Sequence, residues 1–552
     1  MPETTLNPTA RTPVEGGAGN SRAGLAADAL AAAASVAVPT RSSAGKAPNI
    51  LFPTGDPAIT TQEPEFFRDL NLDQIVDTVT KGREAANLKP FFHTPLTNLD
   101  QIAFRHEIMA DLQNEAFFNG LKAFSDKMLA LRDRIATEKS LHYQYQKGRT
   151  LLRAAEHYVE GVENLHRALA AAPLRSRGLT AFRDFLGKYV ASPDFKTLAD
   201  DTRSVRDGLA AVRYCVLIQD SNITVRNYES EGDYSAEVEE AFGIFKHAAV
   251  KDYHVEFSEN TSMNHVEAMI LDYVAKLNPA AFAALNGFAT KHPTFVDSAI
   301  LEFDRGIQFY VSFLDYVRGL AAQGLRFCFP VVSETSKETL SRGGFDIALA
   351  SKLIASNQPP VCNDFHLTGA ERMIVITGPN QGGKTTFARA FGQLHYLASI
   401  GCPVPGTEVR VALVDRVFTH FDTEEDIANL SGKLKDDLIR MQRILSQATP
   451  RSLVVMNEIF ASTTLDDAIF LGRDMLTRFT ALDVLGVCVT FLDELSTLNE
   501  KVVSMSASIV PENPTQRTFR ITRMPASGLA YALALAEKYH LTYGSLKGRI
   551  TK

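Results

Sequence analysis

The stretch MIVITGPNQGGKTT, from Met373 to Thr386, decides the fold of the C-terminal part of this chain. It begins with a short apolar run rich in β-branched side chains, which predicts a buried strand over Met373 to Thr377. The pattern G-x-x-x-x-G-K-T follows from Gly378 to Thr385, and a helical pattern comes after it. Between a strand and a helix, such a loop closes backbone N–H groups around phosphates, and the helix dipole strengthens the attraction. The sequence therefore predicts a nucleotide site.

The chemistry of the loop residues suggests a nucleoside triphosphate and Mg²⁺ as cofactors. Lys384 would reach the β- and γ-phosphates, and the Thr385 hydroxyl would be a ligand of Mg²⁺. The residues expected to hold the phosphates are Gly378, Pro379, Asn380, Gln381, Gly382, Gly383, Lys384, Thr385 and Thr386.

The segment SLVVMNEI, from Ser452 to Ile459, predicts the second half of this site. An apolar strand that ends in an acidic pair is the usual place for Mg²⁺ coordination and for polarising an attacking water. Here the pair is Asn457 and Glu458. Glu458 is placed as the general base. Asn457 can offer a carbonyl oxygen to Mg²⁺, although a neutral ligand holds a hard dication less strongly than a carboxylate does.

Length and composition set the outer bounds. A chain of 552 residues implies two to four domains, and 45% hydrophobic with 22% charged residues is typical of a soluble globular protein. No apolar run approaches the roughly 18 residues that span a bilayer, so no membrane association is expected. The five cysteines are scattered and lack a C-x-x-C pair, which predicts reduced thiols in a cytoplasmic protein. The net charge of −7 gives no overall attraction to nucleic acid.

The pattern of residues divides the chain into three parts. Residues 1–55 are rich in Ala, Gly and Ser and are expected to form a disordered tail. Residues 56–345 are mainly helical, with 3- and 4-residue apolar spacing in Phe117 to Ile135, Thr150 to Ala171 and Val266 to Leu285. They predict a helical core or lever domain, with Arg213 to Ile218 among the few strand candidates.

Residues 346–552 alternate strands with helices, which predicts a mostly parallel α/β sheet. The strand candidates are Met373 to Thr377, Val409 to Val414, Leu453 to Met456 and Val484 to Phe491. The fold class is therefore multidomain, a helical domain followed by a nucleotide-binding α/β domain.

Several blocks of this sequence resemble the ATPase domain of the MutS family of mismatch-repair proteins. They are GPNQGGKTT, FGQLHYLASIGCPVPG, VDRVFTHFDTEEDIANLSGKLKDDL and SLVVMNEIFASTTLDDA, in the family's order between Asn363 and about Ala532. Leu88 to Leu112 also resembles the start of that family's helical core. The resemblance implies an ABC-type ATPase that uses ATP and Mg²⁺ and works as a homodimer on DNA, with each nucleotide held between two subunits.

The resemblance also implies roles for residues that the loop pattern does not identify. Ser431 matches the serine that reaches the γ-phosphate of the other subunit. Asp467 falls at the aspartate of the loop that joins the two sites across the dimer, and Asp466 is a near-equal candidate. Glu458 matches the catalytic carboxylate.

Two departures from the family pattern predict slow ATP hydrolysis. Where the family has A-T-H, this chain has Val489, Thr490 and Phe491, and a phenyl ring cannot sense a γ-phosphate or relay a proton. Asn457 removes a second polar function from the site. Each such group typically contributes roughly 10²-fold or more. If the strand continued to Asp493, its carboxylate would point to the same face as Phe491 and would substitute for the missing polar group.

DNA binding is open to two interpretations. We expect no mismatch reader, because the helical core follows directly after the N-terminal tail, and residues 226–259 carry nine acidic against three basic residues. The first hypothesis is an ATP-switched dimeric clamp on double-stranded or branched DNA. The alternative is a nucleotide-switched protein-interaction module that has lost DNA binding. A metabolic kinase or transporter ATPase is disfavoured, because no substrate-binding or membrane-docking element accompanies the loop.

Overall fold

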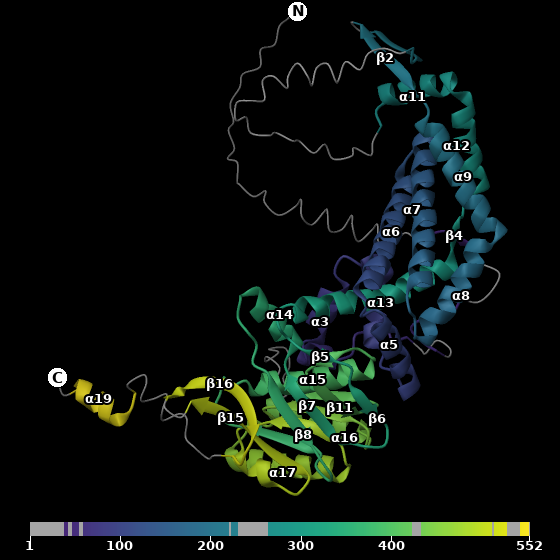
Figure 1. The fold of residues 1–552 in the computed structure, drawn as a ribbon. Coiled ribbons are helices and arrows are strands. Elements are labelled where there is room, and N and C mark those ends of the chain that lie inside the picture. The colour runs from purple at the N-terminus through teal and green to yellow at the C-terminus, as the bar shows by residue number, and fades with distance from the viewer. Residues whose placement is uncertain are drawn as a thin grey trace, which may run out of the picture. The chain divides into compact units, whose positions relative to one another are not determined.

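Two compact units make up the chain. The computed structural model describes residues 38–41, 47–53, 59–219, 222–229, 263–421, 432–510, 513–526 and 541–550. The larger unit combines residues 41–127, 159–197 and 297–552, and the smaller one combines residues 1–40, 128–158 and 198–296. Helices dominate the described chain up to residue 321, and strands concentrate after it (Figure 1). This is the predicted combination of helical and α/β parts.

Helices account for most of the described residues before the phosphate loop. They are α2 (Phe66–Asp69), α3 (Leu72–Thr80), α4 (Lys89–His93), α5 (Leu99–Asp111), α6 (Glu115–Ser140), α7 (Gln144–Ala171), α8 (Arg177–Ala191), α9 (Pro193–Ala210), α11 (His265–Leu277), α12 (Pro279–Lys291), α13 (Ser298–Ala321) and α14 (Ile347–Ala355).

The helical periods in the sequence are confirmed for α6 and α7, but the predicted helix over Val266 to Leu285 is broken. It forms α11 and α12, which meet at 107°. Pro279 opens α12. A proline has no N–H to continue the preceding helix, and its ring suits a first helical turn. No single helix in the described ranges is long and apolar enough to cross a bilayer. This bent pair meets the criterion only when both helices are taken together.

The smaller unit carries a hairpin beside α11. Strands β2 (Tyr214–Gln219) and β3 (Asn222–Asn227) pair antiparallel, with Val216 opposite Val225. The strand expected over Arg213 to Ile218 is thus confirmed as β2. Val274 and Phe282 form the buried centre beneath the hairpin, with Val225 packed against them. Of the predicted acidic stretch 226–259, residues 230–259 lie outside the described residues.

A six-stranded sheet forms the centre of the C-terminal half. Its order is β12-β13-β14-β9-β15-β16, parallel except for β16 at one edge. The strands are β9 (Met373–Thr377), β12 (Val417–His420), β13 (Leu453–Asn457), β14 (Leu485–Val489), β15 (Val502–Val510) and β16 (Asn513–Arg523). β9, β13 and β14 are buried throughout, as expected for central parallel strands. The predicted, mostly parallel sheet is confirmed.

The strand expected over Val409 to Val414 lies in a different sheet. As β11 (Glu408–Ala412), it joins β6 (Val331–Ser333), β7 (Thr339–Gly344) and β8 (Asn363–Leu367) in the order β6-β11-β7-β8. Its buried residues Val409 and Val411 alternate with half-buried and exposed ones, which is typical of a sheet with one covered face. Two of these strands precede residue 346. A separate pair joins β5 (Phe327–Cys328) to β10 (Val404–Pro405).

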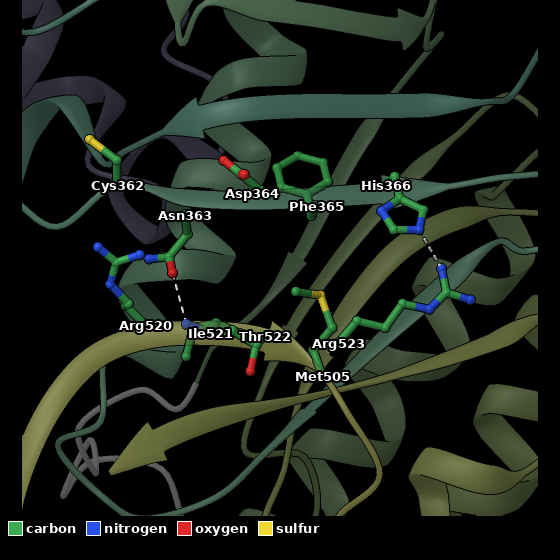
Figure 2. A pocket seen from close by; sticks show the side chains of 10 residues that line it. All are labelled: Cys362, Asn363, Asp364, Phe365, His366, Met505, Arg520, Ile521, Thr522 and Arg523. Carbon is green, nitrogen blue, oxygen red and sulfur yellow. Dashed lines mark hydrogen bonds between the residues drawn. The ribbon is translucent and has the colours of Figure 1, made fainter. Parts of the chain in front are cut away.

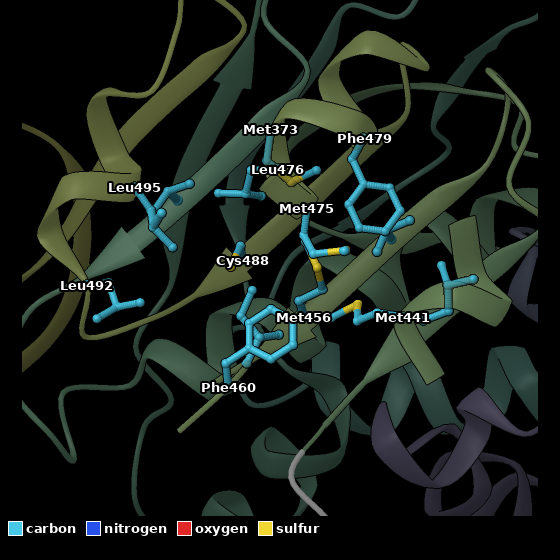
Figure 3. Close-up of a cluster of buried hydrophobic side chains, with 14 of the residues drawn as sticks. Met373, Met441, Met456, Phe460, Met475, Leu476, Phe479, Cys488, Leu492 and Leu495 are labelled. Atoms are coloured by element: carbon cyan, nitrogen blue, oxygen red, sulfur yellow. The ribbon is translucent and has the colours of Figure 1, made fainter. Parts of the chain in front are cut away.

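Helices cover the six-stranded sheet. They are α15 (Lys384–Ser399), α16 (Lys433–Gln447) and α17 (Leu465–Ala481), and α19 (Tyr543–Ile550) lies near the C-terminus. Met475, Leu476 and Phe479 of α17 pack on Met456 of β13 and Cys488 of β14, as Figure 3 shows. This apolar cluster fixes the strands whose C-terminal ends carry the candidate site.

Residues 47–53 are packed, although they fall in the segment expected to be a disordered tail. Ile50, Leu51 and Phe52 are buried. The Tyr310 hydroxyl donates to the carbonyl of Ile50 at 2.6 Å. These apolar residues come after the Ala/Gly/Ser-rich stretch and have enough apolar surface to bury. The average composition of residues 1–55 hides this short apolar run. Residues 1–37 lie outside the described part.

Helix α15 is bonded along its length to the segment between residues 69 and 105. Its buried position and these bonds make it a fixed part of the larger unit. The bonds run from Arg389 Nε to Asp69 O (2.9 Å), Gln393 Nε2 to Leu70 O (2.8 Å), Tyr396 Oη to Phe92 O (2.7 Å) and Arg105 Nη1 to Ile400 O (2.7 Å). The buried Arg105 cation thus faces the C-terminal end of α15, where the helix dipole favours positive charge.

Asp483 connects segments at the N-terminal ends of the central strands through hydrogen bonds. Its carboxylate and carbonyl accept hydrogen bonds from Lys337, Arg372 and Lys501. Partial burial would raise the pKa of this carboxyl, but the hydrogen bonds from the three cations outweigh it and lower the pKa to about 2. The stabilising effect is therefore complete above the unfolded value near 4 and is lost as the pH falls towards 2.

We predict that Asp483→Asn destabilises the protein by about 1–2 kcal/mol at pH 7, because a network of ion pairs loses its centre. The loss should shrink between pH 4 and pH 2, where the wild-type carboxylate itself becomes protonated. Urea midpoints at pH 7 and pH 3 measure both effects. Asp474→Asn, in an exposed pair with Arg478, is the control and should change little. Equal losses for Asp483→Asn at both pH values would contradict the linkage.

Candidate functional site

The predicted phosphate loop lies between β9 and α15, at the C-terminal end of a central strand. Gly378 and Gly383 have φ values of 109° and 89°, and Gln381 also has a positive φ of 59°. A Cβ on Gly378 would lie 3.1 Å from the backbone nitrogen of Ala507, and a Cβ on Gly382 would lie 2.9 Å from the carbonyl of Pro379. The glycines are therefore required by both backbone conformation and close approach.

The residues of the loop differ in exposure. Asn380 and Gln381 face solvent, whereas Pro379, Gly382 and Lys384 are buried and Thr385 and Thr386 are half-buried. The tip of the loop is therefore exposed to solvent, whereas its base is mostly buried.

The Lys384 ammonium lies inside the loop. Its Nζ donates to the carbonyl of Gly378 at 2.6 Å and lies 3.4 Å from Asn380 Oδ1. Burial lowers the pKa of this lysine, Glu458 and Asp493 raise it, and Arg517 lowers it further. Three charged groups thus act on Lys384, which is the electrostatic centre of the site.

The structure brings together the two residues predicted to hold Mg²⁺. Thr385 Oγ1 donates to Asn457 Oδ1 at 2.8 Å, across the gap between α15 and the end of β13. Both contribute oxygen atoms, which is the donor type that Mg²⁺ prefers. Within the described ranges, no group of three or more His, Cys, Asp or Glu side chains gathers to hold a metal. The donor set is therefore compatible with Mg²⁺ that also uses water and phosphate oxygens.

Glu458 follows β13 in a left-handed backbone conformation. Its φ is 55°, Phe460 has a φ of 57°, and Glu458 N donates to the carbonyl of Val489 at 2.8 Å. Non-glycine residues adopt such angles at an energetic cost that concentrates at functional sites. The turn leaves the half-buried Glu458 side chain close enough to Lys384 to affect its pKa.

The chain after β14 does not continue as the strand that would have turned Asp493 to the face of Phe491. The predicted strand over Val484 to Phe491 ends at Val489. The backbone then turns, because Thr490 Oγ1 accepts from Leu492 N at 3.0 Å. Asp493 begins a 3₁₀ helix instead of continuing the strand. The carboxylate nevertheless acts on Lys384, whereas the Phe491 ring is 49% exposed.

Asp467 lies in the first turn of α17, where its side chain is exposed. Thr464 Oγ1 donates to Asp467 Oδ2 at 2.9 Å, and Asp467 N donates back to Thr464 Oγ1 at 3.3 Å. Within one chain, Asp467 therefore completes a helix cap. Asp466 is also exposed. Ser431 lies outside the described residues.

Two residues beside the loop were missed by sequence reasoning. Arg517 Nε donates to the carbonyl of Asn380 at 3.2 Å. Phe519 has a φ of 57° and is 48% exposed. A Cβ on Gly383 would lie 3.6 Å from its Cα and Cβ. Both belong to β16, more than a hundred residues after the loop, and no local pattern links them to it.

A cavity of about 270 Å³ opens between β8 and β16 next to these residues. Figure 2 shows Asn363 from β8 and Arg520, Ile521 and Thr522 from β16 around it. Asn363 joins the two strands, since its side chain donates to Phe519 O at 3.2 Å and accepts from Ile521 N at 2.7 Å. The cavity is therefore linked to the backbone of Phe519 through the Asn363 side chain.

Comparison with known proteins identifies this region. Residues 374–538 match the family profile of MutS domain V. Through this domain, the chain belongs to the MutS family. Similar proteins include the DNA mismatch repair proteins MutS of Chlorobaculum tepidum, 26% identical over 215 residues, and of Chlorobium phaeovibrioides, 29% identical over 195 residues. These alignments cover 38% and 35% of this chain but 24% and 22% of the relatives. The chain thus spans about a quarter of the length of these relatives.

Proposed function

We propose that this MutS-family chain binds ATP with Mg²⁺ and uses it as a switch for dimerisation. The observation that carries the proposal is the convergence of Lys384, the bonded pair Thr385 and Asn457, and Glu458 at one edge of a parallel sheet. Ligands of open α/β sheets bind at this edge. The P-loop ATPase arrangement of the ABC type accounts for each of these residues.

The triphosphate would lie along the loop. Backbone N–H groups from Gly378 to Thr386 would hold it, Lys384 would neutralise the β- and γ-oxygens, and Arg517 adds a second cation at the same loop. The exposed ring of Phe519 would stack against the base, and its neighbour Arg520 lines the cavity of Figure 2. Mg²⁺ would be held by Thr385 and Asn457 and would screen the phosphate charge.

Hydrolysis is expected to be slow. Glu458 would polarise the attacking water, while Asn457 binds Mg²⁺ weakly and Phe491 provides no hydrogen bond. Asp493 acts on Lys384, but a carboxylate opposite a γ-phosphate repels it at neutral pH. The set of residues expected to bind ATP is therefore more complete than the set expected to hydrolyse it.

A homodimer would place the two nucleotides between subunits. Large apolar side chains of α17 support such an interface, since Leu465 and Phe470 are 59% and 73% exposed on the helix that carries Asp467. Exposed apolar side chains of this size gather at protein contacts. Ser431 and Asp467 would then act across the dimer, with Asp466 as the alternative to Asp467.

We further propose that the helical part acts on double-stranded or branched DNA, as the MutS relatives suggest by name. A nucleotide-switched protein-interaction module is the alternative. It is favoured by one observation: the hairpin β2–β3 exposes apolar side chains, among them Tyr214 and Leu217, where phosphate binding would require Lys and Arg.

DNA affinity as a function of salt distinguishes the two. We predict that duplex or branched DNA binds at low salt and that log affinity falls steeply with log salt, because each phosphate contact releases a counterion. Fluorescence anisotropy between about 50 and 200 mM salt covers the range in which six or more contacts cost roughly 10³-fold or more. Absence of binding at low salt, with ATP affinity intact, would select the interaction module.

A further inference from the structure

A cavity of about 500 Å³ lies in the larger unit, between the C-terminal parts of α5 and α13 and the strand β5. Its volume is within the range of roughly 300–1,000 Å³ that is typical of small-molecule sites. Pro403 lines it and follows the C-terminal end of α15, whereas the phosphate loop precedes the N-terminal end of that helix. The proposed nucleotide switch therefore makes no use of this cavity.

The walls of the cavity are largely aliphatic. The buried side chains among them, none more than 9% exposed, are Met109, Leu112, Leu314, Val317 and Leu325. The exposed residues Gln113, Ala321 and Arg326 also line the cavity, which shows that it opens to solvent. An apolar molecule that enters through this opening would bury its surface against the walls, and such burial favours binding.

Arg318 is a half-buried cation that lines the cavity. Its Nη2 donates to the carbonyl of Leu112 at 2.7 Å, and its guanidinium carbon lies 3.6 Å from the centre of the Phe118 ring. Burial lowers the pKa of Arg318, while the charges of Glu115 and Asp315 raise it. Neither carboxylate forms an ion pair with Arg318 or lines the cavity. Because an arginine keeps its charge in proteins, this guanidinium is a fixed cation that retains N–H donors for an anion.

Arg326 adds a second positive charge at the same cavity. Its side chain is exposed and, within the described chain, forms no ion pair or hydrogen bond. The described residues that line the cavity include these two arginines and no aspartate or glutamate. The cavity therefore combines aliphatic walls with net positive charge, which fits a ligand that is apolar along its length and anionic at one end.

We propose that this cavity binds a fatty acid of medium chain length. The aliphatic walls would hold the hydrocarbon chain, and the guanidinium groups of Arg318 and Arg326 would bind the carboxylate, whose planar geometry they match. A compact anion such as phosphate would leave the walls unfilled, and a neutral apolar molecule would leave the arginines unpaired. The acyl chain of an anionic membrane lipid has the same chemistry, and vesicle binding separates this source from the free acid.

The length of the hydrocarbon chain tests the role of the walls. Isothermal titration calorimetry of the full chain with octanoate, decanoate and dodecanoate should give saturable binding, with a dissociation constant that falls roughly 4-fold for each added CH₂. 1-Decanol has the chain of decanoate without its charge and should bind at least ~10-fold more weakly. No saturable binding of decanoate up to about 1 mM, or equal affinities for decanoate and 1-decanol, would overturn the proposal.

Substitutions at the opening test the place of binding. Arg326→Gln removes the charge of an exposed side chain and should weaken decanoate binding at least ~10-fold without affecting 1-decanol. Arg451→Gln is the matched control, because Arg451 is an exposed arginine in the turn before β13 and does not line the cavity. It should leave the affinity for decanoate within about twofold. Ala321→Phe places a ring at the opening from an exposed position and should weaken the binding of both ligands.

Unchanged decanoate affinity in Arg326→Gln or in Ala321→Phe would place the binding elsewhere and overturn the proposal. Co-sedimentation with phosphatidylglycerol vesicles tests the source of the ligand, and the chain should stay in the supernatant. Sedimentation with the vesicles that Ala321→Phe abolishes would replace the free acid by a lipid acyl chain as the ligand. ATP affinity, measured in parallel, should be equal in all of these proteins, and the failure of this proposal leaves the proposed function untouched.

Discussion

Replacing Lys384 by alanine should abolish nucleotide binding at micromolar concentrations. The ammonium is buried inside the phosphate loop, next to the carbonyl of Gly378. Charge-assisted bonds to two phosphates contribute about 3–4 kcal/mol together, so the dissociation constant for ATP should rise by at least ~100-fold. Isothermal titration calorimetry with ATP and Mg²⁺ measures this change.

The control for this variant is Lys352→Ala, which removes an exposed lysine from α14 and should leave ATP affinity unchanged. Removing Lys384 also leaves the loop carbonyl of Gly378 without its donor. Circular dichroism and a thermal melt of Lys384→Ala therefore accompany the titration, to show that the fold persists. Retained affinity in a folded Lys384→Ala protein would exclude the phosphate loop as the binding site.

Changing Glu458 to glutamine should separate binding from hydrolysis. Glutamine keeps the size of the side chain but cannot accept a proton from water. Turnover should therefore fall by a further ~100-fold from an already slow wild-type rate, while ATP affinity changes little. Single-turnover assays with labelled ATP detect rates in this range.

Glu494→Gln is the matched control, since Glu494 is an exposed carboxylate in the 3₁₀ helix after β14. It should leave turnover unchanged. If Glu458→Gln hydrolyses ATP at the wild-type rate, Glu458 is not the base. Asp493 would then be the next residue to test, because its charge also reaches Lys384.

The parts of the fold that follow from the sequence are those set by local pattern. The β9 strand, its loop and α15 were predicted because strand, glycine-rich loop and helix are consecutive. β13 and its Asn457–Glu458 pair were predicted because an apolar run that ends in such a pair is also a local pattern. The contact between Thr385 and Asn457 follows once both strands are known to end at one edge of a parallel sheet.

The parts that sequence reasoning missed depend on distant segments. Arg517 and Phe519 reach the loop from β16, which adds to the sheet antiparallel after the last parallel strand. β11 was assigned to the wrong sheet because the partners of a strand are not encoded in its own apolar pattern. The break between α11 and α12 could have been predicted, since Pro279 lies within an otherwise helical period.

Asp493 shows how a local turn redirects a side chain. Alternation along an extended strand would have placed it on the face of Phe491. The hydrogen bond between Thr490 and Leu492 ends the extension first. A threonine side chain that bonds its backbone two residues on is a known turn device, yet its competition with β-structure cannot be decided from one sequence.

The central claim is that ATP acts as a switch for dimerisation. The most direct test is sedimentation equilibrium of the wild-type chain, with Mg²⁺ and a non-hydrolysable ATP analogue or with Mg²⁺ alone. We predict that the analogue lowers the dimer dissociation constant at least ~10-fold, equivalent to about 1.4 kcal/mol of coupling. An unchanged dissociation constant, with calorimetry showing that the analogue is bound, would contradict it.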